Sequence, residues 1–144
     1  MQIATKFLGL KEIDEEKIIT FKEGLLGFPD DKRFVLFPQP KTPFLFLQSV
    51  EKPDLCFILV NPYVIKPDYL PEFSAEILGE LGITEQKPAV YTLVVIPDDI
   101  NKMRTNLQAP VVINVEQRKA RQVVLNHDYP IQYHLPAQPL KEGA

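Results

Sequence analysis

Hydrophobic residues lie along this chain in short runs that are rich in β-branched and aromatic side chains. Each run is bounded by Pro, Asp, Asn or Gly, and the 14 prolines are about twice the usual share. Runs of this kind are typical of β-strands joined by tight turns. The pattern predicts strands at 17–21, 34–37, 44–49, 55–60, 90–96, 111–115 and 122–126, with further pairing segments in 3–10 and 131–135.

Several of these runs are continuously apolar and do not alternate with polar residues, as in "LCFILV" at 55–60. Such runs indicate strands covered on both faces, a tightly curved barrel, or apolar surface kept for a partner. These alternatives stay open at this level. The fold class that we predict is mainly β: a single compact, barrel-like antiparallel β domain over 1–136, followed by a flexible C-terminal tail at 137–144.

One stretch, 71–82, departs from the β pattern and predicts a short helix. Pro71 suits its first turn and Gly82 suits a C-terminal stop. Apolar residues recur at every fourth position and form one face of this helix, namely Phe73, Ile77 and Leu81.

Acidic residues recur at the same interval, at Glu72, Glu76 and Glu80, with Asp68 one turn earlier. The simpler interpretation is a solvated helix face opposite the apolar one. Like charges four residues apart slightly destabilise an isolated helix, however. A second hypothesis is therefore an acidic ridge that binds a basic protein surface.

The net charge of −3, with a pI near 5.4, disfavours direct nucleic-acid binding, which needs a basic surface. The one local basic cluster, at Arg118, Lys119 and Arg121, is more simply a solvated turn and strand edge. A single cysteine excludes an internal disulfide and fits a reducing compartment. No apolar run has the length of a signal-peptide core or of a membrane-spanning helix, so we expect a cytoplasmic protein without membrane contact.

Catalytic chemistry has few candidates in this sequence. Cys56 lies in the middle of an apolar run without a nearby cation, which is typical of a buried thiol rather than a nucleophile. The two histidines show no metal-binding spacing, and the glycines of "GLLGFPDD" lack the lysine of a phosphate loop. We therefore expect no metal and no cofactor, and interpret Gly24 and Gly27 as turn residues with positive φ. One alternative stays open, a small β-barrel enzyme that uses Cys56 or His127 with Asp128.

The stretch "RTNLQAPVVIN" places Asn106 and Leu107 in a bend before a strongly apolar strand. Asn106 fits a left-handed or turn-capping position. The alternative is a recognition loop, since binding residues often lie on loops held by a rigid scaffold.

Taken together and in order, these motifs resemble the FliW family of bacterial flagellar assembly factors. The resemblance rests on "FKEGLLGFP" (21–29), "FLFLQSVEKPDLCFILVNP" (44–62), "PDY" (67–69), "TNLQAPVVIN" (105–114) and "ARQVVLNHDYP" (120–130). It implies a small cytoplasmic non-enzyme with a compact, barrel-like β fold.

The resemblance also implies partners. Members bind newly made flagellin before its export, and they bind CsrA, a dimeric RNA-binding repressor of flagellin translation. Secretion of flagellin releases the factor, which then antagonises CsrA allosterically and restores translation. We expect the free protein to be a monomer. The resemblance supplies no contact residues; on charge and position alone, we expect the partner-binding residues to be Asp68, Tyr69, Glu72, Glu76, Asn106 and Leu107.

Overall fold

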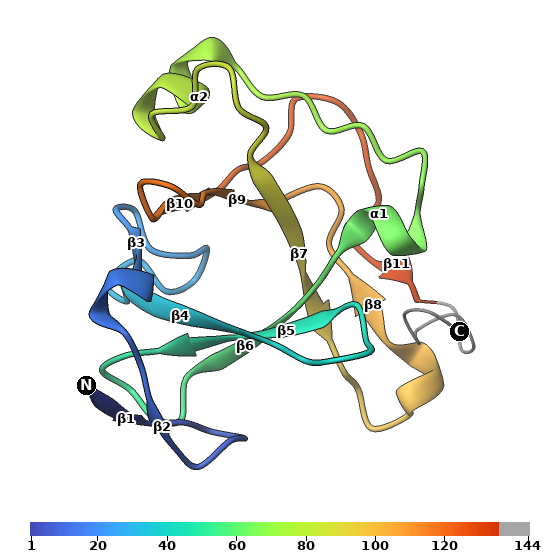
Figure 1. Ribbon diagram of the computed structural model, residues 1–144. Coiled ribbons are helices and arrows are strands. Elements are labelled where there is room, and N and C mark those ends of the chain that lie inside the picture. The colour runs from blue at the N-terminus through green and yellow to red at the C-terminus, as the bar shows by residue number, and fades with distance from the viewer. Residues whose placement is uncertain (136–144) are drawn as a thin grey trace.

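The computed structural model describes residues 1–135, and its centre is a closed barrel of seven strands (Figure 1). Around the barrel the order is β7–β6–β5–β4–β3–β10–β9, and β9 pairs back onto β7. The bounds of these strands are Ile19–Phe21 (β3), Arg33–Pro38 (β4), Phe44–Ser49 (β5), Cys56–Val60 (β6), Ala89–Val95 (β7), Val111–Asn114 (β9) and Lys119–Gln122 (β10).

All neighbouring barrel strands are antiparallel except β3 and β10, which run parallel and pair through Thr20↔Lys119 and Phe21↔Ala120. The mainly β, barrel-like prediction is confirmed. Outside the barrel, β8 (Arg104–Thr105) and β11 (Tyr133–His134) continue the sheet from β7. A separate hairpin is formed by β1 (Gln2–Ala4) and β2 (Leu10–Glu12).

The continuously apolar runs are explained by a barrel that is covered outside as well as filled inside. Leu45 and Leu47 of β5 point inward and pack in the central core with Phe34 and Leu59. The outward residues of the same strands meet other elements. Val35 of β4, for example, packs with Ile3 and Ile13 near the β1–β2 hairpin. Two of the alternatives left open by the sequence, a tightly curved barrel and strands covered on both faces, are therefore both correct.

The prediction of one helix is wrong in number, because two short α-helices are present: α1 (Pro62–Ile65) and α2 (Ala75–Glu80). Two 3-10 turns, η1 (Glu15–Lys17) and η2 (Ile100–Lys102), accompany them. A single helical turn such as α1 leaves no periodic pattern in the sequence; Asn61 starts it by accepting a hydrogen bond from the Tyr63 N–H. Within residues 1–135, neither helix has the length and hydrophobicity needed to span a membrane.

The predicted helix at 71–82 begins too early and ends where expected. Its N-cap is Ser74, whose side chain accepts from the Ile77 N–H, so Pro71 lies outside the helix. At the other end Gly82 has φ +69°, and the Ile83 N–H donates to the Leu78 carbonyl. This is a Schellman ending, in which glycine relieves the strain of the left-handed position.

Strand positions are predicted well in the middle of the chain and less well near its ends. The segment 44–49 is β5 as predicted, whereas the predicted strand at 122–126 is the earlier β10. Residues beyond β10 still donate backbone hydrogen bonds, from Val123 to Pro110 and from Leu125 to Gln108. Because Pro110 has no N–H to return, regular pairing stops there. The predicted tail at 137–144 lies outside the described residues.

Gly24 provides a test of the turn that inserts Leu25 into the central core. It has φ +66°, and a Cβ added there would lie 2.3 Å from the Phe28 carbonyl oxygen. Gly27 in the same turn has φ +85° but open space around it. We expect Gly27→Ala to lower the free energy of unfolding by about 1–2 kcal/mol through backbone strain alone. Gly24→Ala adds a steric clash, so its loss should exceed about 3 kcal/mol.

Urea unfolding followed by circular dichroism measures both variants against the parent chain. Equal losses for the two variants would contradict the close backbone approach at Gly24.

Candidate partner-binding site

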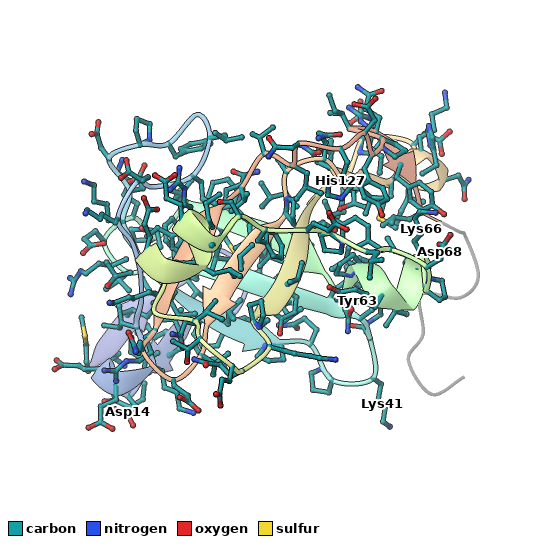
Figure 2. All side chains as sticks on the ribbon, turned by 90° about the horizontal axis from the view of Figure 1, so that it is seen from above. Asp14, Lys41, Tyr63, Lys66, Asp68 and His127 are labelled. Atoms are coloured by element: carbon teal, nitrogen blue, oxygen red, sulfur yellow. The ribbon has the colours of Figure 1, made fainter. Side chains whose placement is uncertain are left out.

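Aromatic rings connect α1 to the loop at 126–131 and define one face of the molecule. The ring centroids lie 5.9 Å apart for Tyr63 and Tyr69, 4.8 Å for Tyr69 and Tyr129, and 5.2 Å for Tyr129 and His127. Two segments that are far apart in sequence, 63–69 and 127–129, thus meet through ring contacts. Figure 2 shows Tyr63 and His127 on the same side of the molecule as Lys66 and Asp68.

Tyr69 is the internal anchor of this face. Its side chain is 2% exposed, and its hydroxyl donates to the Leu107 carbonyl over 2.7 Å. Burial raises the pKa of the Tyr69 phenol well above its usual value, with smaller contributions from Tyr63 and Tyr129. The neutral hydroxyl therefore remains a hydrogen-bond donor throughout the physiological pH range.

Gln108 fixes the loop that carries His127 and Tyr129. Its side-chain amide donates to the Leu125 carbonyl over 2.8 Å and to the His127 carbonyl over 3.0 Å, and it accepts from the Tyr129 N–H over 2.6 Å. One side chain thus replaces the strand partner that this loop lacks. The loop is held by hydrogen bonds as well as by packing.

Leu70 projects from the aromatic face with 69% of its surface exposed, while its backbone is held on both sides. The Leu70 N–H donates to the Tyr129 hydroxyl over 3.0 Å, and its carbonyl lies 3.3 Å from His127 Nε2. The other large exposed apolar side chains nearby are Tyr63 and Val64 on α1 and Ile131 in the 126–131 loop. An apolar residue presented on a fixed backbone is a suitable anchor for a partner protein.

One acidic side chain, Asp68, lies beside this face, and two more follow it along the chain, Glu72 before α2 and Glu76 on α2. Glu72 and Glu76 are exposed, and Asp68 pairs with Lys66 over 3.0 Å. The hydrogen bond from Lys66 holds the pKa of Asp68 below its usual value, and the same bond raises the pKa of Lys66. We use "aromatic–acidic face" for Tyr63, Leu70, His127 and Tyr129 together with Asp68, Glu72 and Glu76.

The predicted contact residues divide into exposed and buried groups. Asp68, Glu72 and Glu76 are exposed, and their role in partner binding stays a prediction. Tyr69 and Leu107, in contrast, are buried, with Leu107 0% exposed, so the expectation that they offer surface anchors is wrong. Both fill the core cluster beneath the aromatic face, and the apolar surface that they were expected to provide comes from Leu70 instead.

Asn106 is half-buried and has a local structural role. Its side-chain oxygen accepts from the Gln108 N–H over 2.9 Å and from the Ala109 N–H over 3.1 Å. This turn-capping geometry is the simpler of the two interpretations offered by the sequence. A contact with a partner stays a prediction for this residue.

Sequence reasoning missed Tyr63, Leu70, Gln108 and Tyr129. Gln108 left a detectable signal, because an amide within the run "NLQAPVV" needs internal hydrogen-bond partners. The other three left none. Their positions depend on contacts between segments about 60 residues apart, such as Leu70 with Tyr129.

The two sites of the alternative enzyme hypothesis, Cys56 and the neighbouring pair His127 and Asp128, lie in different parts of the fold. Cys56 lies on β6 with its Sγ 3.8 Å from the Phe57 carbonyl, whereas His127 contacts Leu70 and Tyr129. Burial raises the pKa of the Cys56 thiol to about 11, although Lys6 partly opposes this shift. Over residues 1–135, no group of three or more His, Cys, Asp or Glu side chains is arranged to hold a metal ion. The geometry gives the enzyme hypothesis no support.

A barrel filled by its own side chains and an exposed face held by hydrogen bonds define a closed β-barrel protein with an ordered, partly apolar outer surface. Comparison with known proteins gives the particular family. The family model described as "FliW protein" matches residues 2–135. The chain therefore belongs to the FliW family of flagellar assembly factors.

Relatives and a solved structure agree with this assignment. The chain is 43% identical over 135 residues to the flagellar assembly factor FliW of Caldicellulosiruptor saccharolyticus, covering 92% of this chain and 89% of that protein. It is 42% identical over 137 residues to the FliW of Geobacillus thermodenitrificans, covering 94% and 95%. A crystal structure of the flagellar assembly factor FliW superimposes with a TM-score of 0.87 at 40% identity, covering 96% of this chain and 99% of that one.

The raised pKa of Cys56 predicts slow thiol labelling. Because the thiolate is the reactive form, Ellman's reagent at pH 8 should react far more slowly with the folded chain than with the chain in urea. The folded rate should still rise steeply at pH 10, whereas the unfolded rate should be half-maximal near pH 9.0, the ordinary pKa of a cysteine thiol, and approach its plateau by pH 10. Rapid labelling at pH 8 without urea would contradict the raised pKa of this half-buried thiol and reopen a catalytic role.

Proposed function

We propose that this chain is a cytoplasmic partner-switching regulator that binds flagellin and the translational repressor CsrA. The observation that carries the proposal is its membership of the FliW family over residues 2–135. Flagellin that awaits secretion occupies the protein and leaves CsrA free to silence the flagellin message. Once flagellin is secreted, the released protein binds CsrA, antagonises it allosterically, and translation resumes. In this proposal the free protein is a monomer and its action is non-catalytic.

The aromatic–acidic face supports the proposal for a basic partner such as CsrA. Asp68 supplies negative charge beside the aromatic rings, Glu72 and Glu76 continue that charge along the chain into α2, and Leu70 supplies an exposed apolar anchor. Complementary charges increase the rate of association and exclude incorrect partners, whereas buried aromatic and aliphatic groups supply most of the affinity. The face contains both kinds of group.

Rigidity of this face also favours binding. Hydrogen bonds from Gln108 and between Tyr129 and Leu70 hold the backbone around the exposed side chains before any partner arrives. A surface that is already ordered loses less conformational entropy on association. The same network joins the 66–73 segment to the 126–131 loop, so a displacement of either segment alters the whole face.

Calorimetric titration of CsrA into this protein, alone and saturated with flagellin, tests the switch. We expect heat of binding with the free protein and its loss after saturation, because one protein molecule serves either partner. Binding of CsrA that flagellin leaves intact would indicate separate sites and a ternary complex, contrary to the switch. If neither partner binds, the proposal fails as a whole.

Charge reversal tests the aromatic–acidic face. Glu72→Lys with Glu76→Lys should weaken CsrA binding by about tenfold, because two attractive contacts become repulsive. The matched control is Asp54→Lys with Asp98→Lys, which changes the net charge equally at two exposed loop positions outside this face. The same loss in both double variants would show that net charge matters and this surface does not.

A further inference from the structure

A cleft of about 500 Å³ lies on the outer side of the parallel β3–β10 pair, beside the C-terminal end of α2. Its floor follows from the alternation of strand residues. Ile19 and Phe21 of β3 and Ala120 of β10 are buried in the barrel, so Thr20, Lys22, Lys119 and Arg121 face outward into the cleft. Figure 1 shows α2 above β10 and β3, where it forms one wall.

Two features shape the rim of this cleft. Glu80 and Leu81 line the wall at the end of α2, and Gln117 and Arg118 line the turn that joins β9 to β10. The turn is fixed, since the Asn114 side chain accepts from the Gln117 N–H and donates to the Leu81 carbonyl. The cleft is therefore a concavity between anchored elements.

The cleft is cationic in a protein of net charge −3. Two acidic side chains, Glu23 and Glu80, accompany four basic ones in its lining, namely Lys22, Arg118, Lys119 and Arg121. The sequence showed Arg118, Lys119 and Arg121 as one basic cluster, and the β3–β10 pairing adds Lys22 to it. The simpler interpretation of that cluster as a solvated turn and strand edge is therefore incomplete.

The basic side chains of the cleft differ in the hydrogen bonds and ion pairs that they already form. The Arg118 guanidinium donates to the Glu16 carbonyl, and Arg121 forms an ion pair with Glu80. Both members of the Arg121–Glu80 pair remain partly exposed. An exposed ion pair of this kind contributes little to stability, so its partner can be exchanged.

We propose that this cleft binds an acidic peptide segment of a partner protein. A carboxylate of the peptide replaces Glu80 at Arg121, and further carboxylates meet Lys119 and Lys22. The existing contact with Glu80 shows that the Arg121 guanidinium is oriented to bind a carboxylate within the cleft. The inference goes beyond the proposed function, because it holds whether or not flagellin and CsrA are the partners.

The acidic side chains in the same cleft favour a peptide over a nucleic acid as its ligand. Glu23 and Glu80 lie among the basic residues, and a phosphate backbone with a charge on every unit would meet them repeatedly. Peptide carboxylates, in contrast, stand on flexible side chains that can turn toward the basic residues and away from Glu23 and Glu80. The volume is also that of a site for a few residues, since small-ligand pockets range over roughly 300–1,000 Å³.

Fluorescence anisotropy with a fluorescein-labelled hexaglutamate peptide tests binding. We expect saturable binding at low salt that weakens as salt is added, and no binding of a labelled hexalysine peptide. Labelled hexauridylate, which carries phosphates in place of carboxylates, tests whether the cleft binds a nucleic acid instead. Tighter binding of hexauridylate than of hexaglutamate would overturn the proposal in favour of a nucleic-acid site, and the absence of saturable hexaglutamate binding would overturn it outright.

Variants locate the binding in the cleft. Lys119→Gln should weaken hexaglutamate binding about two- to fivefold, the effect of one exposed ion pair, whereas the exposed Lys87→Gln outside the cleft should leave it nearly unchanged. Glu80→Gln should strengthen binding, because it frees Arg121. The matched control is Glu76→Gln, which removes the same charge from the same helix without touching Arg121.

Circular dichroism and urea unfolding check that each variant folds. Equal effects of Lys119→Gln and Lys87→Gln, or of Glu80→Gln and Glu76→Gln, would show that the peptide senses net charge only, and the cleft would then be no site.

Discussion

β7 pairs with three different strands, and this triple pairing determines the shape of the molecule. Its first residues pair with β9 through Val90↔Val112, its middle pairs with β6 through Val60↔Thr92, and its end pairs with β8 through Val94↔Thr105. Closure through β9 satisfies edge groups that would otherwise be open and encloses the central core. All other elements, including both candidate surfaces, are attached to the outside of this closed sheet.

Buried and half-buried amide side chains hold the attached loops. Gln48 accepts from the Lys6 N–H and donates toward carbonyls of the 49–55 turn, and Gln122 joins Leu26 to Ala109. Gln108 and Asn114 do the same beneath the aromatic–acidic face and beside the cationic cleft. Among the described residues, no buried side-chain nitrogen or oxygen lacks a hydrogen-bond partner. Irregular loops can therefore pack on the barrel without the desolvation penalty of unpaired groups.

The sequence predicts what depends on neighbours along the chain and misses what depends on distant contacts. The run at 44–49 and the stop at Gly82 follow from side-chain chemistry within a few residues, and the structure agrees with both. The exposure of Glu72 and Glu76 also follows from spacing. The burial of Tyr69 escapes prediction because it results from contacts with Leu107 and Tyr129, far along the chain. No local pattern encodes such a contact.

The parallel pairing of β3 with β10 joins Thr20 to Lys119, at opposite ends of the described chain. Contacts of such long range form slowly, because most of the chain must be ordered to bring the two strands together. During synthesis, β3 emerges long before β10, and until then one edge of β3 stays unpaired. The barrel, and with it every surface that depends on β10, is completed only after residues up to Gln122 have left the ribosome. A flagellar assembly factor built this way gains its closed barrel only late in its own synthesis.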